Sequence, residues 1–90
     1  MKARRRSPAV PKRRRKRRYV VLIESGPRNL GAWVPDLPGC VSTGKTLAEV
    51  RRNIREAIAF HIEGTERDGD TVPEPTSTCA TVKVRTNSRR

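Results

Sequence analysis

The chain has 90 residues, a formal net charge of +12 at pH 7 and two cysteines. This length allows one domain with a modest core, and two cysteines exclude a disulfide scaffold or a recognisable zinc site. There is no apolar run of about 20 residues that could cross a membrane, and no apolar stretch behind the basic start that would make a secretory signal. We therefore expect a cytoplasmic protein with buried cysteines, stabilised in part by self-association or by a partner.

The positive charge is concentrated in residues 1–18, which hold 11 basic and no acidic side chains, while the rest of the chain holds 10 basic and 9 acidic ones. Mutual repulsion, prolines and a lack of apolar side chains predict a disordered tail. Two interpretations stay open, a nonspecific nucleic-acid contact through phosphates or a solubilising extension from a mis-assigned start. Under the first, the candidate contacts are Arg13, Arg14, Arg15, Lys16, Arg17 and Arg18.

Three short strands are expected next. Residues 19–24 are β-branched and aromatic, which predicts the first strand, and a turn cluster at 25–29 leads into a second strand at 30–34. Pro35 has no backbone N–H to donate to a sheet and so ends that strand. A rigid corner over residues 35–39 then reverses the chain into a third strand at 40–43, and Gly39 allows a positive φ there.

A helix is expected after residue 46. Thr46 and Glu49 have the spacing of a capping box, and apolar residues recur at helical spacing from Leu47 to Ile62. Gly69 suits the left-handed position that commonly ends a helix.

The end of the chain predicts one more strand. Residues 71–76 form a proline-containing extended linker, and residues 78–84 then alternate, with Ala80, Val82 and Val84 on one side. The order β-β-β-α-β predicts an α+β domain over residues 19–86, a small sheet with one helix packed on one face, followed by a frayed end at 87–90.

One face of this sheet should be left without cover. The first strand is apolar on both faces, and one helix covers only one of them, so the other face predicts a contact with a second copy or a partner protein. Trp33 is out of phase with Ala32 and Val34, which leaves two placements open: an interface hot spot, or core beneath the helix. The candidate partner-binding residues are Tyr19, Trp33 and Asp36.

The sequence argues against catalysis. His61 is the sole histidine and lies on or beside the apolar stripe of the helix, where a packed side chain is more common than a general base. Glu24 and Asp36 lack the third acid that a magnesium site would need, and the glycines form no phosphate-binding loop. We expect no enzyme activity, no bound metal and no cofactor.

The ordered motifs from Trp33 to Thr76 resemble those of the HicB-like antitoxins. That family pattern is a hairpin, a "PDLPGC" corner, a "G-x-T-x-x-E" helix start, an "EA" pair in the helix and a final "DG-x-x-(I/V)P-x-P". The corresponding residues are Pro35 to Cys40, Gly44, Thr46 and Glu49, Glu56 and Ala57, and Asp68 to Pro75.

The resemblance implies a partial, degenerate ribonuclease-H-like fold and neutralisation of a small HicA-like messenger-RNA-cleaving toxin by complex formation. It also implies a homo-oligomer. The basic tail is not part of the family pattern, and the C-terminal DNA-binding domain of many members has no counterpart here, so repression by that route is not expected. Two alternatives stay open: a nucleic-acid-binding protein acting through the tail, and an orphan domain without a toxin.

Overall fold

The structure, a computed structural model, describes residues 16–87 as a three-stranded antiparallel sheet and one long helix. The elements follow in the order β1 (Leu22–Ser25), β2 (Leu30–Trp33), β3 (Val41–Gly44) and α1 (Leu47–Arg67). The sheet has the order β1-β2-β3, so β2 is its central strand and β1 and β3 are its edges.

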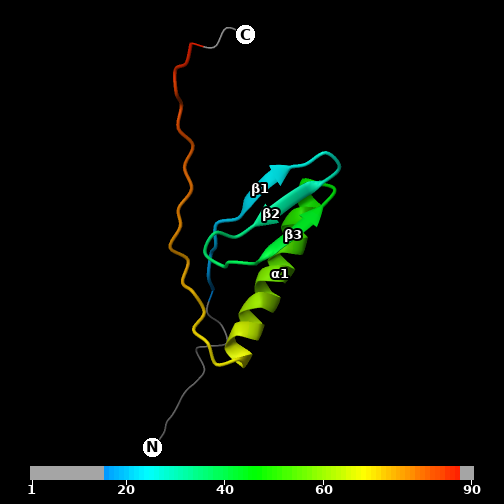
Figure 1. Cartoon of the computed structure of the whole chain (residues 1–90), viewed down its shortest axis with the longest axis vertical. Coiled ribbons are helices and arrows are strands. Elements are labelled where there is room, and N and C mark those ends of the chain that lie inside the picture. The colour runs from blue at the N-terminus through cyan, green and yellow to red at the C-terminus, as the bar shows by residue number, and fades with distance from the viewer. Residues whose placement is uncertain (1–15, 88–90) are drawn as a thin grey trace, which may run out of the picture.

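The helix lies against one face of the sheet, mainly over β3 and then over β2 (Figure 1). The opposite face is covered by no other element of the described residues. This arrangement confirms the expected α+β class with one helix on one face of a small sheet. Within residues 16–87, no helix has the length and apolarity needed to cross a membrane.

The core lies between α1 and the sheet and is closed at one end by the corner. Leu37, at the tip of the corner, is fully buried, and the backbone N–H of Val34 donates to the carbonyl of Cys40 at 3.3 Å across its base. Gly39 has the expected positive φ, at 87°. The buried members of the core are Ala32, Val34, Leu37, Cys40, Val50 and Ile54.

The two cysteines differ from each other. Cys40 is buried as expected, and this burial raises the pKa of its thiol, which favours the neutral form. Cys79 is exposed, so the expectation that both are buried is wrong for it. The reason is that Cys79 belongs to a segment that does not join the sheet of its own chain.

The helix begins with the expected cap. The Thr46 hydroxyl accepts a hydrogen bond from the Glu49 backbone N–H at 3.0 Å, and the Glu49 carboxylate accepts one from the Lys45 N–H at 2.7 Å. At the other end, Gly69 has a φ of 79° just past the last turn. Leu47 differs from the expected buried stripe, since this first residue of α1 is 53% exposed and the buried residues of the helix are Val50 and Ile54.

The expected fourth strand does not form within the described residues. Residues 78–87 are extended and exposed, and residues 78–84 pair with none of the three strands. Figure 1 shows this segment, orange to red, running beside the sheet at a distance and ending well away from it. Alternation identified an extended segment with one apolar side, but it did not determine which sheet would accept it.

Candidate protein-docking surface

The sheet face opposite α1 carries a row of exposed apolar side chains. Leu22 lies opposite Trp33, and Trp33 lies opposite Val41, so the three form one line across all three strands. Their exposed fractions are 36%, 40% and 63%, in that order. We call these three residues the outer row. The neighbouring row on the same face consists of Glu24, Gly31 and Thr43.

The phase of β2 explains why the tryptophan is exposed. Successive side chains of a strand point to opposite faces, and Ala32 is 3% exposed beneath the helix, so Trp33 must point to the face without a helix. The alternative that places Trp33 in the core beneath the helix is therefore wrong. Its exposure leaves a large aromatic surface available to a partner, and such side chains are frequent at the centres of interfaces.

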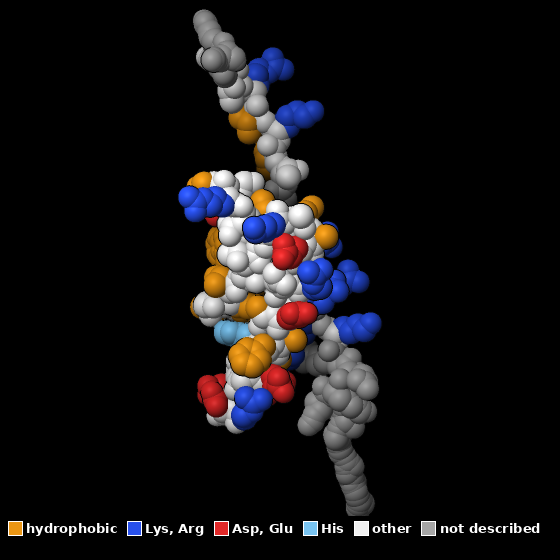
Figure 2. Space-filling model, turned by 90° about the vertical axis from the view of Figure 1, so that its right-hand side faces the viewer, with side chains coloured by type: hydrophobic (Ala, Val, Ile, Leu, Met, Phe, Trp, Pro, Cys, Tyr) orange, Lys and Arg blue, Asp and Glu red, His pale blue; other side chains and the backbone are white. Residues whose placement is uncertain are grey.

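Apolar surface continues from the outer row around the β3 edge onto the helix. Val41 and Phe60 line the same hollow of about 500 Å³, and Phe60 is 73% exposed. His61 lines this hollow too, which places it beside an apolar surface. Hydrophobic side chains also reach the surface among charged ones in the space-filling view (Figure 2). Among residues 16–87, no group of three or more His, Cys, Asp or Glu side chains could hold a metal ion.

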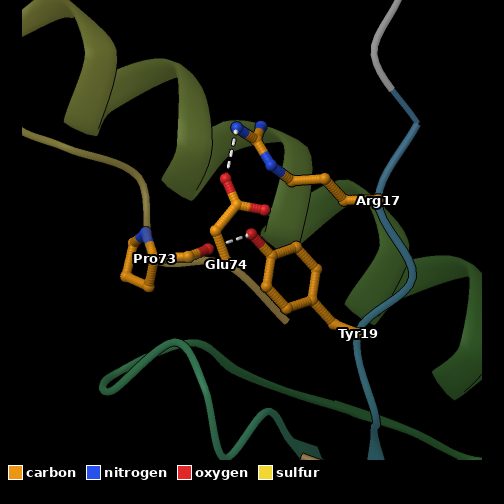
Figure 3. Close-up of polar contacts among 4 residues, drawn as sticks. All are labelled: Arg17, Tyr19, Pro73 and Glu74. Atoms are coloured by element: carbon orange, nitrogen blue, oxygen red, sulfur yellow. Dashed lines mark hydrogen bonds and ion pairs between the residues drawn. The ribbon is translucent and has the colours of Figure 1, made fainter. Parts of the chain in front are cut away.

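Two of the three predicted partner-binding residues fasten the linker that follows the helix. The Tyr19 hydroxyl donates to the Pro73 carbonyl at 2.6 Å (Figure 3). The Asp36 carboxylate accepts from the Thr76 backbone N–H at 2.9 Å and hydroxyl at 3.2 Å, and from the Ser77 backbone N–H at 2.9 Å and hydroxyl at 2.8 Å. We call these contacts of Tyr19 and Asp36 the linker clamp.

The clamp changes the acidity of Asp36. The backbone and hydroxyl hydrogen bonds of Ser77 have the largest effect on Asp36, because they favour the ionised carboxylate and lower its pKa. Burial opposes them, the weaker hydrogen bonds of Thr76 add to the lowering, and the pKa of Asp36 is held below its ordinary value. The corner acid therefore has a structural function in this chain. A role of Tyr19 or Asp36 in binding a partner stays a prediction.

The basic residues of the predicted nucleic-acid contact divide into two groups. Residues 13–15 lie outside the described part of the chain, whereas Lys16 and Arg18 are exposed. Arg17 is different, because its side chain is only 16% exposed and its guanidinium lies 3.7 Å from the Glu74 carboxylate beside the clamp (Figure 3). Its Nε atom is buried without a hydrogen-bond partner among the described residues. Arg17 thus joins the start of the domain to the linker.

Two residues of this surface, Val41 and Phe60, are not among the predicted partner-binding residues. Val41 could have been found, because pairing the strands through the corner puts it opposite Trp33 on the bare face. Phe60 could also have been found, because it is the single phenylalanine and falls outside the apolar stripe of the helix. That the two line one hollow depends on how α1 sits on β3, which no local pattern contains.

Comparison with known proteins gives this geometry a context. A family model described as the HicB-like antitoxin of bacterial toxin–antitoxin systems matches residues 19–88. Among solved structures, a chain of the HicA3 and HicB3 toxin–antitoxin complex has a TM-score of 0.60 and 32% sequence identity, covering 67% of this chain and 70% of that one.

Two proteins similar in sequence match shorter parts of the chain. An uncharacterised 14.9 kDa protein of Haemophilus phage HP1 is 45% identical over 56 residues, which is 62% of this chain and 42% of the phage protein. A UPF0150 protein of Helicobacter pylori is 45% identical over 47 residues, 52% of this chain and 65% of that protein. In both cases, the match spans less than two thirds of the relative.

Proposed function

The chain belongs to the HicB-like antitoxins of bacterial toxin–antitoxin systems, and from this membership we propose that it is the antitoxin of such a pair. In this proposal it binds a small HicA-like, messenger-RNA-cleaving toxin and keeps that toxin inactive. The observation that carries it is the likeness, at 32% identity, to a chain of a complex named for a toxin and its antitoxin. Inhibition is stoichiometric, and the chain itself catalyses nothing.

The outer row is the part of the molecule best suited to the centre of this complex. A stable interface buries roughly 800 Å² on each partner, with apolar and aromatic side chains at its centre and polar ones at its rim. Trp33 lies between Leu22 and Val41 in the row, and Phe60 extends the apolar surface around the β3 edge. The toxin should therefore dock on the bare face of the sheet, with Trp33 near the centre.

An RNA-cleavage assay tests the proposal. The HicA-like toxin from the same genome would be titrated with the chain, with the Trp33→Ala variant and with the Thr43→Ala variant. We expect the wild-type chain to stop cleavage near a fixed molar ratio, and Trp33→Ala to weaken inhibition by about 30-fold or more, as for a hot-spot residue. Thr43 lies on the same face outside the row, so Thr43→Ala should inhibit like the wild type.

Two results would count against this account, each in a different way. If the wild-type chain fails to inhibit cleavage at any ratio, the antitoxin function is wrong. If it inhibits and Trp33→Ala inhibits equally well, the function stands, but the outer row is not the docking surface. Circular dichroism and thermal melting of each variant would show that it is folded.

A second candidate function rests on the charge of the tail. Residues 1–18 hold 11 of the 21 basic side chains, and both Lys16 and Arg18 are exposed. Such a segment attracts any polyanion, so nonspecific contact with RNA or DNA would accompany toxin binding. This activity would depend on salt and on the tail, whereas an apolar toxin interface would depend on neither.

A further inference from the structure

The C-terminal segment, residues 78–87, is extended and exposed, yet residues 78–85 have the pattern of a strand with one buried face. Val82 is 79% exposed and Val84 is 68% exposed, and both lie on the same side of the alternation as Ala80. Figure 2 shows the segment projecting from the body with hydrophobic side chains on one side and basic ones on the other. Neither the apolar side nor the strand edges of this segment find a partner among residues 16–87.

The root of this segment is fixed in place. The linker clamp holds residues 73–77 through Tyr19 and Asp36, and Arg17 lies 3.7 Å from Glu74 in the same stretch. A frayed chain end would be unattached, but this one is anchored just before the first residue of the alternating pattern. The direction in which the segment leaves the body is therefore part of the fold.

The same molecule has an open acceptor for a strand. β1 is an edge strand, and α1 lies mainly over β3 and β2, so the helix side of β1 is only partly covered. A groove of about 680 Å³ lies there, with an apolar lining from Val21 and Ile23 on one wall and Ile54 and Ile58 on the other. A strand added to the β1 edge would place every second side chain in this groove.

We propose that two copies of the chain exchange these segments, so that residues 78–85 of each copy form a fourth strand against β1 of the other. Ala80, Val82 and Val84 then fill the partner's groove. The occupant is a second copy because each chain carries both an unfilled groove beside β1 and an anchored, strand-like segment that pairs with none of its own three strands. In a two-fold exchange, the groove of each copy is filled by the segment of the other, so no groove or segment is left for a third copy. A different protein in the groove would leave the segment exposed.

Charge gives this dimer a distinctive dependence on salt. The groove is rimmed by Arg18, Arg51 and Arg55, and the incoming segment carries Lys83 and Arg85. These like charges oppose the exchange, and salt screens them, so the dimer should become tighter as salt is added. An acidic peptide or a nucleic acid in the same groove would be weakened by salt instead.

Sedimentation of the full chain without toxin tests the exchange, using wild type, the double variant Val82→Glu with Val84→Glu, and Thr81→Glu as the matched control. We expect a dimer for the wild type and for Thr81→Glu, whose new charge lies on the other side of the segment. The double variant should raise the dimer dissociation constant by about 100-fold or more, because it would bury two carboxylates. Both valines are exposed in the single chain, so the monomer should still fold.

Hydrogen–deuterium exchange then locates the contact. The amides of residues 19–25 should be protected in the wild-type dimer and lose that protection in the double variant. A wild type that is monomeric at every salt and protein concentration would overturn the proposal, as would a dimer that survives both glutamates. The test needs no toxin, so its failure leaves the antitoxin function untouched, and failure of toxin inhibition leaves the dimer untouched.

Discussion

At the scale of single residues, Asp36 shows how one side chain can fix the path of a distant segment. Its carboxylate accepts four hydrogen bonds from Thr76 and Ser77, which lie 40 and 41 positions further along the chain. Asp36 belongs to the corner motif through which the chain resembles its family, and sequence reasoning assigned it to partner binding. The structure shows that this acid anchors the linker from which the C-terminal segment leaves, and its role in partner binding stays a prediction.

The clamp should open in acid, and the sign follows from the direction of the pKa shift. Because folding lowers the pKa of Asp36, the clamp stabilises the fold above the unfolded value, near 3.8, and this stabilisation is lost as the pH falls through the lower folded value. Following the amide signals of Thr76 and Ser77 by NMR from pH 6 to pH 2, we expect a midpoint below 3.8. In Asp36→Asn this transition should be absent, and a wild-type midpoint at or above 3.8 would contradict the clamp.

At the scale of elements, the contact between β3 and α1 depends on a residue without a side chain. Gly44 is buried at the end of β3, and a Cβ atom there would lie 2.6 Å from the backbone nitrogen of Val50 and 2.8 Å from its Cα. Backbone atoms cannot move aside as the end of a flexible side chain can. This close approach is the physical reason for the glycine of the "G-x-T-x-x-E" helix start.

The Gly44→Ala substitution should therefore separate the helix from the sheet. We expect it to lower the free energy of unfolding by about 3 kcal/mol or more, the upper end for overpacking, because the obstacle is backbone. Gly31→Ala is the matched control, since a Cβ at that strand position meets nothing within 4 Å, and it should change the stability by less than about 1 kcal/mol. Urea denaturation measures both, and equal losses in the two variants would refute the role of the close approach.

Some parts of this fold can be predicted from neighbouring residues alone, and others depend on residues far apart in the sequence. Alternation, the capping pair and the prolines predicted three strands, the helix and the corner close to where the structure has them, because each signal lies within the element that it specifies. The fourth strand failed because alternation gives a segment one apolar side without naming the sheet that will bury it. The tasks of Tyr19 and Asp36 were missed because their partners lie 40 or more residues away.

At the scale of the whole molecule, the positive charge is distributed unevenly along the chain. The tail carries nearly all of the net charge, while the domain that follows it is close to neutral. The outer row on the bare face of the sheet is apolar, and the groove beside β1 has an apolar lining with a basic rim. Toxin binding and polyanion binding should therefore be separable by shortening the chain.

Removing residues 1–15 tests this separation and leaves Arg17 in its contact with Glu74. This deletion takes away eight basic residues, so the logarithmic salt slope for binding single-stranded RNA should be shallower for the shortened chain than for the full chain, by up to about 5.6. Fluorescence anisotropy with labelled RNA at several salt concentrations measures both slopes. The shortened chain should still inhibit the toxin at the wild-type ratio, because apolar contact with the outer row requires no tail. Equal RNA slopes would place the polyanion contact on the domain, where Arg18, Arg51 and Arg55 rim the β1 groove.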